Sequence, residues 1–219
     1  MFDFIKKPKH NYSSYDMLFG DLPLSYWASL HSTELPWNLF KEAKKNIDSN
    51  DKIAAIDILR KIINIPGLES RQYLQAYHFL NELHEHDSGD TTIFGVVLEI
   101  NMAQGNDVLA AYADHSARYY NYSGKSIIWE HGDHSLDALI DGIFEQSKIV
   151  VSQIGPWKDA RKQPPVNEMA RVNFLTSKGL HFGEASQQVL FNDPMAGKLM
   201  HGMLNLMNVL IDRTTPANQ

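Results

Sequence analysis

The residues best suited to contact a nucleotide or a phosphate form one short segment, Arg118-Tyr119-Tyr120-Asn121-Tyr122, with Trp129 shortly after it. Aromatic side chains on a sheet can stack on bases, and an arginine can pair with a phosphate. The formal net charge of −6 argues against broad binding to nucleic acid, which needs a concentrated basic face. Alternating aromatic residues are also typical of a half-buried strand. We expect no nucleic-acid partner, and we keep Arg118 and Tyr120 as candidate ligand-binding residues.

A second candidate is a cationic, irregular segment with the residues Trp157, Lys158, Arg161 and Lys162, followed by Pro164-Pro165. In an otherwise acidic chain, an arginine and a lysine beside a tryptophan could receive a carboxylate, a phosphate or an acidic segment of a partner protein. The alternative is a solvated crossover that only connects a helix to the sheet. We take Trp157 and Arg161, together with His181, as further candidate ligand-binding residues.

Potential metal ligands are concentrated in one short stretch that contains Glu130, His131, Asp133 and His134. The spacing of the two histidines at a strand-to-helix turn can bring two imidazoles onto one ion. The sequence does not reveal a third or fourth ligand, and it contains no cysteine. We therefore interpret these residues as solvated loop histidines and helix-capping acids, and we predict no metal ion and no cofactor.

Standard catalytic motifs do not occur: the sequence lacks Gly-x-Ser-x-Gly, the Rossmann glycine fingerprint and His-Glu-x-x-His. Ser123-Gly124-Lys125-Ser126 resembles the end of a phosphate-binding loop, but it precedes a predicted strand and is interpreted as a hairpin turn. A triad defined by geometry alone, for example a serine with His181 and Glu99, stays open. No catalytic residue is predicted, and an enzyme is the less favoured interpretation.

The spacing of apolar residues changes at a polar segment from His84 to Thr91, which we predict to separate residues 1–88 from 89–219. The spacing is helical before this segment and alternating after it, as in strands with one buried face. Predicted strands cover 94–102, 108–113, 116–122, 125–130, 171–176 and 180–184. The sequence therefore predicts an α+β fold, in which N-terminal helical hairpins pack on an antiparallel sheet of about six strands in ββββ-α-ββ-α order and form one compact unit with it.

Helices are predicted between Pro36 and Leu83, with breaks at 48–51 and at Pro66-Gly67 and with Ser70 as the N-cap of the third helix. Two amphipathic helices, one after Asp133 and one opening at Asp193-Pro194, are expected to cover the sheet. The last helix is apolar most of the way round, which is typical of a helix that is buried on several sides or used at an interface.

The first helix pair resembles a tetratricopeptide repeat. The turn, small, large and terminating positions of such a repeat are occupied by Asn50-Asp51, Ala55, Leu59, Ile63 and Pro66. The resemblance covers about one and a half repeats, which is too few for an independent solenoid. We therefore predict a helical hairpin that caps the rest of the molecule.

The block from Phe94 to Glu130 resembles an uncharacterised bacterial protein family. The residues that carry the resemblance are Leu109-Ala110-Ala111-Tyr112-Ala113-Asp114, Arg118-Tyr119, Asn121, Ser123-Gly124 and Trp129-Glu130, with Ile154-Gly155-Pro156-Trp157 and Gly179-Leu180-His181-Phe182-Gly183 later in the chain. The resemblance implies a bacterial cytoplasmic protein. It brings no activity, cofactor, partner or catalytic residue to this chain.

The absence of cysteine fits a reducing compartment, Met1 to His10 lacks the apolar stretch of a secretory signal, and no window has the composition of a membrane span. We therefore expect a cytoplasmic protein without membrane contact. The favoured function is that of a non-catalytic interaction or scaffold protein, which binds itself or another protein through the helical hairpin, the last helix or the Trp157 segment. The alternative is a small-molecule-binding protein or enzyme with a pocket near Arg118, Arg161 and His181.

Overall fold

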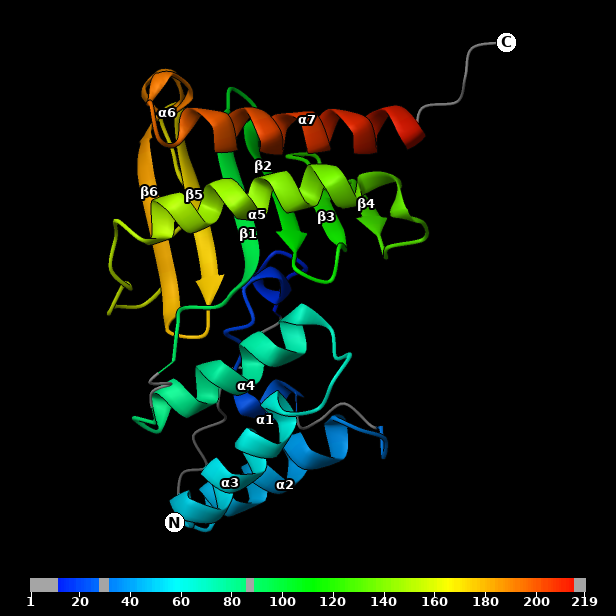
Figure 1. The fold of residues 1–219 in the computed structure, drawn as a ribbon, viewed down its shortest axis with the longest axis vertical. Helices are drawn as coiled ribbons and strands as arrows, with labels where there is room; N and C mark the ends of the chain where they lie inside the picture. Colours follow the sequence, from blue (N-terminus) through cyan, green and yellow to red (C-terminus); the bar gives the residue numbers. More distant parts are fainter. Residues whose placement is uncertain (1–11, 28–31, 86–88, 215–219) are drawn as a thin grey trace, which may run out of the picture.

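The computed structural model describes residues 12–27, 32–85 and 89–214 of the 219-residue chain. Figure 1 shows two parts along the long axis of the molecule, a sheet with two long helices in front of it and a group of shorter helices below. The predicted boundary at His84 to Thr91 falls between α4 (Ser70–Glu82) and β1 (Ile93–Met102). The segment from Met1 to His10, on which part of the localisation prediction rests, lies outside the described residues.

The lower part contains α1 (Leu24–Trp27), α2 (Trp37–Asp48), α3 (Lys52–Ile63) and α4. Their apolar positions recur at helical spacing and meet in one core, which includes Phe40, Ala43, Leu59, Ile62 and Phe79. Asp51 begins α3 as predicted, because its side chain accepts a hydrogen bond from the backbone amide of Ala54 at 3.1 Å.

The predicted N-cap of α4 is wrong by one residue. Glu69 is the N-cap, and its backbone amide donates to the Gln72 side-chain oxygen at 3.1 Å. Ser70 is the first helical residue, and its hydroxyl accepts instead from the backbone amide of Asp114 at 3.0 Å. The hydroxyl therefore joins the helix to the sheet, a contact between residues 44 positions apart that local sequence patterns do not reveal.

Within the described residues the sheet has six strands in the order β4-β3-β2-β1-β5-β6, and every neighbouring pair is antiparallel. The other strands are β2 (Gly105–Tyr112), β3 (Ala117–Tyr120), β4 (Ser126–Trp129), β5 (Met169–Thr176) and β6 (Gly179–Ser186). The first four strands form the predicted meander, and β5 then returns to pair with β1. The α+β class and the antiparallel sheet predicted from the sequence are confirmed.

One face of the sheet is covered by α5 (Asp137–Val151) and α7 (Gly197–Thr214), which cross in front of the strands in Figure 1. Alternate residues of the strands meet the apolar stripes of both helices in a core that contains Val96, Leu98, Ile140, Met200 and Met203. Each of these side chains is at least 95% buried, and such burial stabilises by about 1.5–3 kcal/mol per large side chain. Both amphipathic helices therefore pack on the sheet as predicted, and the structure shows that they share one face, which the sequence did not indicate.

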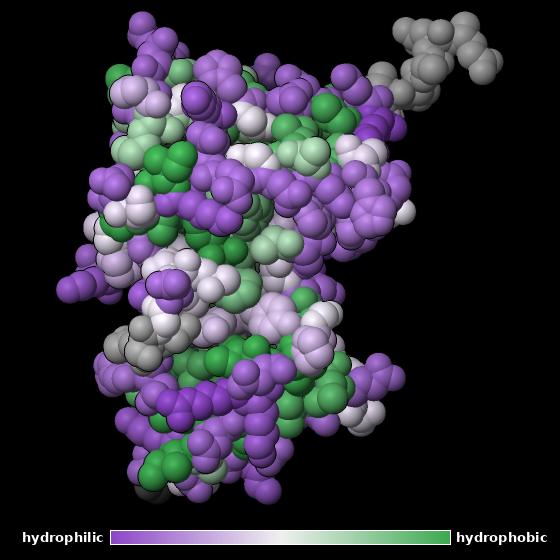
Figure 2. Space-filling view, in the orientation of Figure 1, coloured by the Kyte–Doolittle hydropathy of each residue, from purple (hydrophilic) through white to green (hydrophobic). Residues whose placement is uncertain are grey.

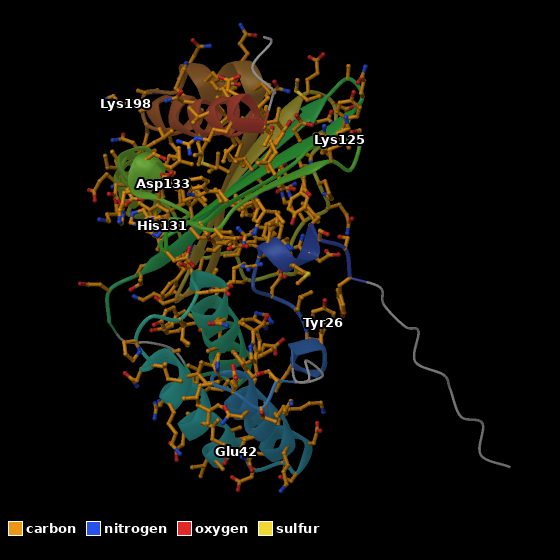
Figure 3. All side chains as sticks on the ribbon, turned by 90° about the vertical axis from the view of Figure 1, so that its right-hand side faces the viewer. Tyr26, Glu42, Lys125, His131, Asp133 and Lys198 are labelled. Atoms are coloured by element: carbon orange, nitrogen blue, oxygen red, sulfur yellow. The ribbon has the colours of Figure 1, made fainter. Side chains whose placement is uncertain are left out.

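The opposite face is covered by the N-terminal segment, which contains a short 3₁₀ turn, η1 (Asp16–Leu18). Leu18 and Phe19 of this segment pack with Leu74 of α4 on the strand residues Val97, Val108, Ala110, Tyr112 and Leu175. In Figure 3 this segment lies on the side of the sheet that faces away from α7. Both faces of the sheet are thus buried, by segments from opposite ends of the chain.

The region after β6 differs from the prediction. A short helix, α6 (Gln187–Asn192), was not expected, and α7 begins at Gly197 rather than at Asp193-Pro194. Asp193 does cap, but it accepts from the backbone amides of Met195 and Ala196 at 2.8 and 2.7 Å, which closes a separate turn before the helix. In the part of the chain that the structure describes, no helix has both the length and the apolar composition needed to cross a bilayer.

Candidate functional site

A cleft of about 860 Å³ opens where the helical part meets the end of the sheet. Its walls come from α4, from the segment after η1, from residues 156–161 and from the β5–β6 hairpin. The volume lies in the range of roughly 300–1,000 Å³ that is usual for small-molecule sites. The cleft combines apolar side chains, among them Phe19, Leu74 and Leu175, with several charged ones.

Arg161 holds the irregular segment against the N-terminal segment. Its Nε donates to Asp21 Oδ2 at 2.8 Å, and a terminal nitrogen donates to Asp16 Oδ1 at 3.2 Å. The guanidinium also lies 4.0 Å from the centre of the Phe19 ring, a cation–π distance. Burial opposes the charged form, but the contacts with Asp21, Tyr15 and Asp16 together outweigh it, and the pKa of Arg161 lies above its ordinary value. The positive charge of Arg161 is therefore already neutralised by protein groups.

Trp157 forms part of the cleft wall through a folded loop. Its indole nitrogen donates to the Ala160 carbonyl oxygen at 3.1 Å, and its ring meets Phe182 edge-on at 5.1 Å between centroids. Lys162 lies over both rings, at 5.5 Å from the Trp157 centroid and 4.9 Å from the Phe182 centroid. Trp157 is nevertheless 37% exposed. The loop is thus fixed on β6 and still presents an aromatic face at the cleft.

The charges that remain available in the cleft belong to Lys158 and Lys178. Among the described residues neither lysine forms an ion pair, whereas Glu82 lies 3.4 Å from His78 and Asp21 pairs with Arg161. Asp159 is the one other charged lining residue of the described chain without an ion pair. With histidine counted as neutral, the three basic side chains of the lining, Lys158, Arg161 and Lys178, balance its three acidic ones, Asp21, Glu82 and Asp159, and the two lysines are the basic groups without an ion pair among the described residues.

The other candidate residues from the sequence lie elsewhere. Arg118 is 3% exposed and donates to the carbonyl oxygens of Ala117 and Trp129 at 3.0 and 3.1 Å, while Glu130 accepts from it at 2.6 Å. Tyr120 lies two residues along on the same face of β3, and neither side chain lines the cleft. The structure therefore brings Trp157 and Arg161 to one site and leaves Arg118 and Tyr120 in a different part of the sheet.

His181 faces the opposite side of the sheet from Arg161. It pairs with Phe174, which belongs to the core beneath α5 and α7, and it is 3% exposed. Burial lowers the pKa of this imidazole, so the ring is neutral near pH 7. Glu99 pairs with Arg171 and Val108 on the other face. A catalytic pair of His181 with Glu99, which the sequence left open, is excluded because the two side chains lie on opposite faces.

Sequence reasoning missed a buried polar network beneath the N-terminal segment. Glu99 is 0% exposed and accepts hydrogen bonds from Tyr15 Oη at 2.6 Å and from Asn173 Nδ2 at 2.7 Å. Arg171 Nη1 lies 3.3 Å from Glu99, and its Nε donates to Glu184 at 2.6 Å. Burial and the neighbouring carboxylate raise the pKa of Tyr15. Charged residues inside otherwise apolar strands, Glu99 and Arg171, could have indicated a buried ion pair. Their pairing depends on β5 lying beside β1, which the sequence did not predict.

The predicted histidine-rich segment is rearranged in the structure. Glu130 pairs with Arg118, and Asp133 accepts from the Ser135 backbone amide at 2.8 Å, so these two acids are engaged elsewhere. His131 and His134 instead meet at Asp137, the first residue of α5, at 3.0 and 2.7 Å. The hydrogen bond from His134 holds the pKa of Asp137 below its ordinary value.

His115 completes this group and was also missed. Its ring centroid lies 5.2 Å from that of His131. The register of the β3–β4 hairpin, in which Ala117 pairs with Trp129, places residue 115 opposite residue 131 when it is continued by two positions. The predicted hairpin could therefore have shown that His115 lies near His131, because the position of its turn fixes which residues lie opposite each other.

No family model, curated protein or solved structure matches the chain. The resemblance to an uncharacterised bacterial family accordingly stays a prediction, and the functional argument rests on the two groups of residues described above.

Proposed function

We propose that the protein binds a small amphipathic molecule, with an apolar body and one anionic group, in the cleft between α4 and residues 156–161. The observation that carries the proposal is the pair Lys158 and Lys178, which have no ion-pair partner among the described residues and stand beside an apolar wall. Binding of a carboxylate or a phosphate would give these lysines the partner that no described residue supplies. The proposal keeps Trp157 and Arg161 as site residues and adds Lys178.

The remaining polar groups of the cleft support a single anionic group rather than a polar ligand. The Thr176 hydroxyl donates to the Gly179 carbonyl oxygen at 2.8 Å and accepts from the Lys178 backbone amide at 3.1 Å, so its one donor hydrogen is already used. Arg161 is neutralised by two aspartates. An apolar body therefore suits the remaining surface of Phe19, Leu74 and Leu175, where burial contributes roughly 25 cal/mol per Å².

The cleft is also built before any ligand arrives. Arg161 joins the irregular loop to the N-terminal segment, and the Trp157 backbone amide donates to the Leu180 carbonyl oxygen at 2.6 Å. These contacts fix the wall on which Trp157 sits. A wall that needs no ordering on binding lowers the entropic cost of association.

The proposal is tested by thermal shift with octanoate, aromatic carboxylates and aryl phosphates, followed by isothermal titration calorimetry with the compounds that stabilise the protein. The expected result is saturable binding that Lys178→Gln weakens about tenfold, because a charge-assisted contact contributes about 1.5 kcal/mol. Trp157→Ala is expected to weaken the same ligands through lost apolar contact. Comparing the carboxylates with the aryl phosphates shows which anionic group the cleft prefers.

The matched control is Lys125→Gln, which changes an exposed lysine of the β3–β4 turn, labelled in Figure 3 at the far end of the sheet. It removes the same charge and should leave the affinity unchanged. Absence of any saturable ligand, or an equal loss in both variants, would contradict the proposal.

The association function that the sequence favoured stays a prediction, and the structure offers it less apolar surface than the sequence suggested. The apolar residues of α7 that are buried in the protein's own core are Leu199, Met200, Met203, Leu206 and Leu210. On the face shown in Figure 2, the layer of α5 and α7 is mostly hydrophilic, whereas the helical part carries a broader apolar band near its junction with the sheet. Light scattering after size-exclusion chromatography would test self-association. If the protein forms an oligomer, the apolar band of the helical part is the first surface to mutate.

A further inference from the structure

Three potential metal ligands from separate segments converge beside the N-terminal end of α5. His115 comes from the β2–β3 turn, His131 from the residues after β4, and Asp137 from the first turn of the helix. Each offers one ligand atom, and the three atoms lie within 4.8 Å of one another. His131 is labelled in Figure 3, where it lies next to the end of α5 that faces the viewer. None of the three residues lines the cleft.

We infer that His115, His131 and Asp137 bind a divalent transition-metal ion, with Zn²⁺ as a suitable ion. Two imidazoles and one carboxylate form a ligand set that suits zinc and other first-row metals, and the chain has no cysteine that would favour a thiolate site. Three protein ligands leave at least one coordination position for water or another small molecule. The inference does not depend on the cleft ligand.

Two of the ligand atoms are buried without a hydrogen-bond partner. His131 Nε2 and Asp137 Oδ1 are shielded from solvent, and neither makes a hydrogen bond within the described structure. They lie 3.0 Å apart, yet they are not aligned as donor and acceptor. Buried polar atoms are rarely left in this state. A separation of roughly 3.0–3.4 Å is what two ligands have when each is about 2.1 Å from one ion.

The third ligand, His115, must move closer to the other two. The widest separation in the group, up to 4.8 Å, exceeds the roughly 3.0–3.4 Å between two ligands of one ion by up to about 1.8 Å. The His115 side chain is 27% exposed, so its ring has room to turn toward the other two ligands.

Both histidines have left-handed backbone conformations. His115 and His131 have φ angles of 61° and 54°, in the left-handed region that residues with a Cβ rarely adopt. Gly132, next to His131, would adopt such a conformation at no steric cost. Positive φ also occurs at Asn50, His84, Asn167 and Glu168, so this conformation is compatible with a binding site without marking one.

Further carboxylates and imidazoles hold the ligands in place. Asp141 Oδ1 lies 2.9 Å from His115 Nε2, and His134 Nδ1 lies 2.7 Å from the second oxygen of Asp137. Metal sites commonly contain such outer contacts, which fix the ring orientation and keep one carboxylate oxygen available for the ion. Asp141 is therefore a positioning residue in this proposal.

The test is isothermal titration calorimetry of Zn²⁺ into the untagged full-length protein after treatment with a chelator, near neutral pH. We expect one ion per chain, a rise in melting temperature on addition of Zn²⁺, and affinity lowered about 100-fold or more in His131→Ala and Asp137→Asn. Asp141→Asn is expected to lower the affinity about tenfold, in line with outer-contact substitutions at other metal sites. Co²⁺ should give the visible absorption of a low-symmetry site in the wild type only.

The matched control is His201→Ala on α7, where the imidazole bonds to the Gly197 carbonyl oxygen away from this group. It should bind Zn²⁺ as the wild type does. His131→Gln, which keeps a polar side chain of similar size, guards against a folding defect, and melting curves without metal verify that the variants fold. Wild-type protein without stoichiometric binding, unchanged affinity in both His131 variants, or an equal loss in His201→Ala would overturn the inference.

Discussion

Ser70 and Asp114 hold each other by two reciprocal hydrogen bonds. The Ser70 backbone amide donates to Asp114 Oδ2 at 2.7 Å, and the Asp114 backbone amide donates to Ser70 Oγ at 3.0 Å. The same carboxylate accepts from the amide and the hydroxyl of Ser116 through its other oxygen. A carboxylate at the positive end of a helix is also favoured by the helix dipole. One aspartate therefore fixes the start of α4, the β2–β3 turn and the contact between the two parts of the molecule.

Asp114→Ala should lower the free energy of unfolding by about 2 kcal/mol, because it leaves the amide of Ser70 and that of Ser116 without their charged acceptor. Asp90→Ala, at an exposed position before β1, should cost less than about 0.5 kcal/mol. Urea denaturation followed by circular dichroism measures both values. Similar costs for the two variants would show that the Asp114 contacts contribute little.

The same carboxylate should make the protein sensitive to acid. Burial raises the pKa of Asp114, but the hydrogen bonds from Ser70 and Ser116 outweigh it and hold the pKa below its ordinary value of 3.8. Because the folded pKa is lowered, the ionised carboxylate stabilises the fold fully above the ordinary pKa, and this stabilisation is lost as the pH falls through the lowered value. The stability difference between the wild type and Asp114→Asn should therefore shrink as the pH falls from about 5 to about 2. A difference that does not change over this range would argue against the assignment.

The buried pair of Glu99 and Arg171 should be strongly coupled. Both side chains are at most 3% exposed, so removing Arg171 leaves the Glu99 carboxylate in the core without a cation and should cost about 3 kcal/mol or more, whereas removing Glu99 leaves Arg171 paired with Glu184 and should cost less. Replacing both, as in Glu99→Leu with Arg171→Met, should cost clearly less than the sum of the single changes. A double-mutant cycle in urea measures the coupling. The exposed pair Glu145 and Lys148, with side chains 66% and 63% exposed, is the control and should show a coupling below about 0.5 kcal/mol.

Two glycines with positive φ should respond differently to substitution by alanine. A Cβ at Gly20, where φ is 66°, would lie 2.6 Å from the Leu74 Cβ, whereas a Cβ at Gly67, where φ is 76°, would have no atom within 4 Å. Gly67→Ala should therefore cost about 1 kcal/mol for the backbone alone, and Gly20→Ala about 3 kcal/mol because the N-terminal segment must also move away from α4. Thermal melting of both variants measures the two losses of stability. Equal shifts would mean that the close approach of Gly20 to α4 is not needed for stability.

Much of the architecture could be predicted because it depends on local patterns. Alternation of apolar residues from Phe94 to Met102 and the short turns that follow correspond to β1 and the meander. Asp51 caps α3 where expected, since a cap needs only its own side chain and the next few amides, whereas Asp133 caps a short 3₁₀ turn (His134–Leu136) that precedes α5. The cap at Ser70 was wrong because its hydroxyl is used by a residue of the sheet.

The sites were harder to predict because they join segments that no local pattern connects. Arg118 and His181 were grouped by residue type, but strand alternation places their side chains on opposite faces of the sheet. Whether either face is open to a ligand depends on which segments of the chain cover it. Lys178 could not be identified as a site residue from the sequence, because the cleft that it lines forms between α4 and the β5–β6 turn. His115 could have been connected to His131 from the hairpin register, and Asp137 joined them through the start of α5.

The sequence by itself determined the α+β class, the meander and the amphipathic helices, because these follow from hydrophobic spacing and turn chemistry over a few residues. Only the tertiary structure decided that β5 pairs with β1, that the N-terminal segment covers the second face of the sheet, and that three ligand residues meet at the end of α5. The physical reason is that long-range pairing depends on the packing free energy of the whole molecule, to which no single segment contributes a recognisable pattern of its own.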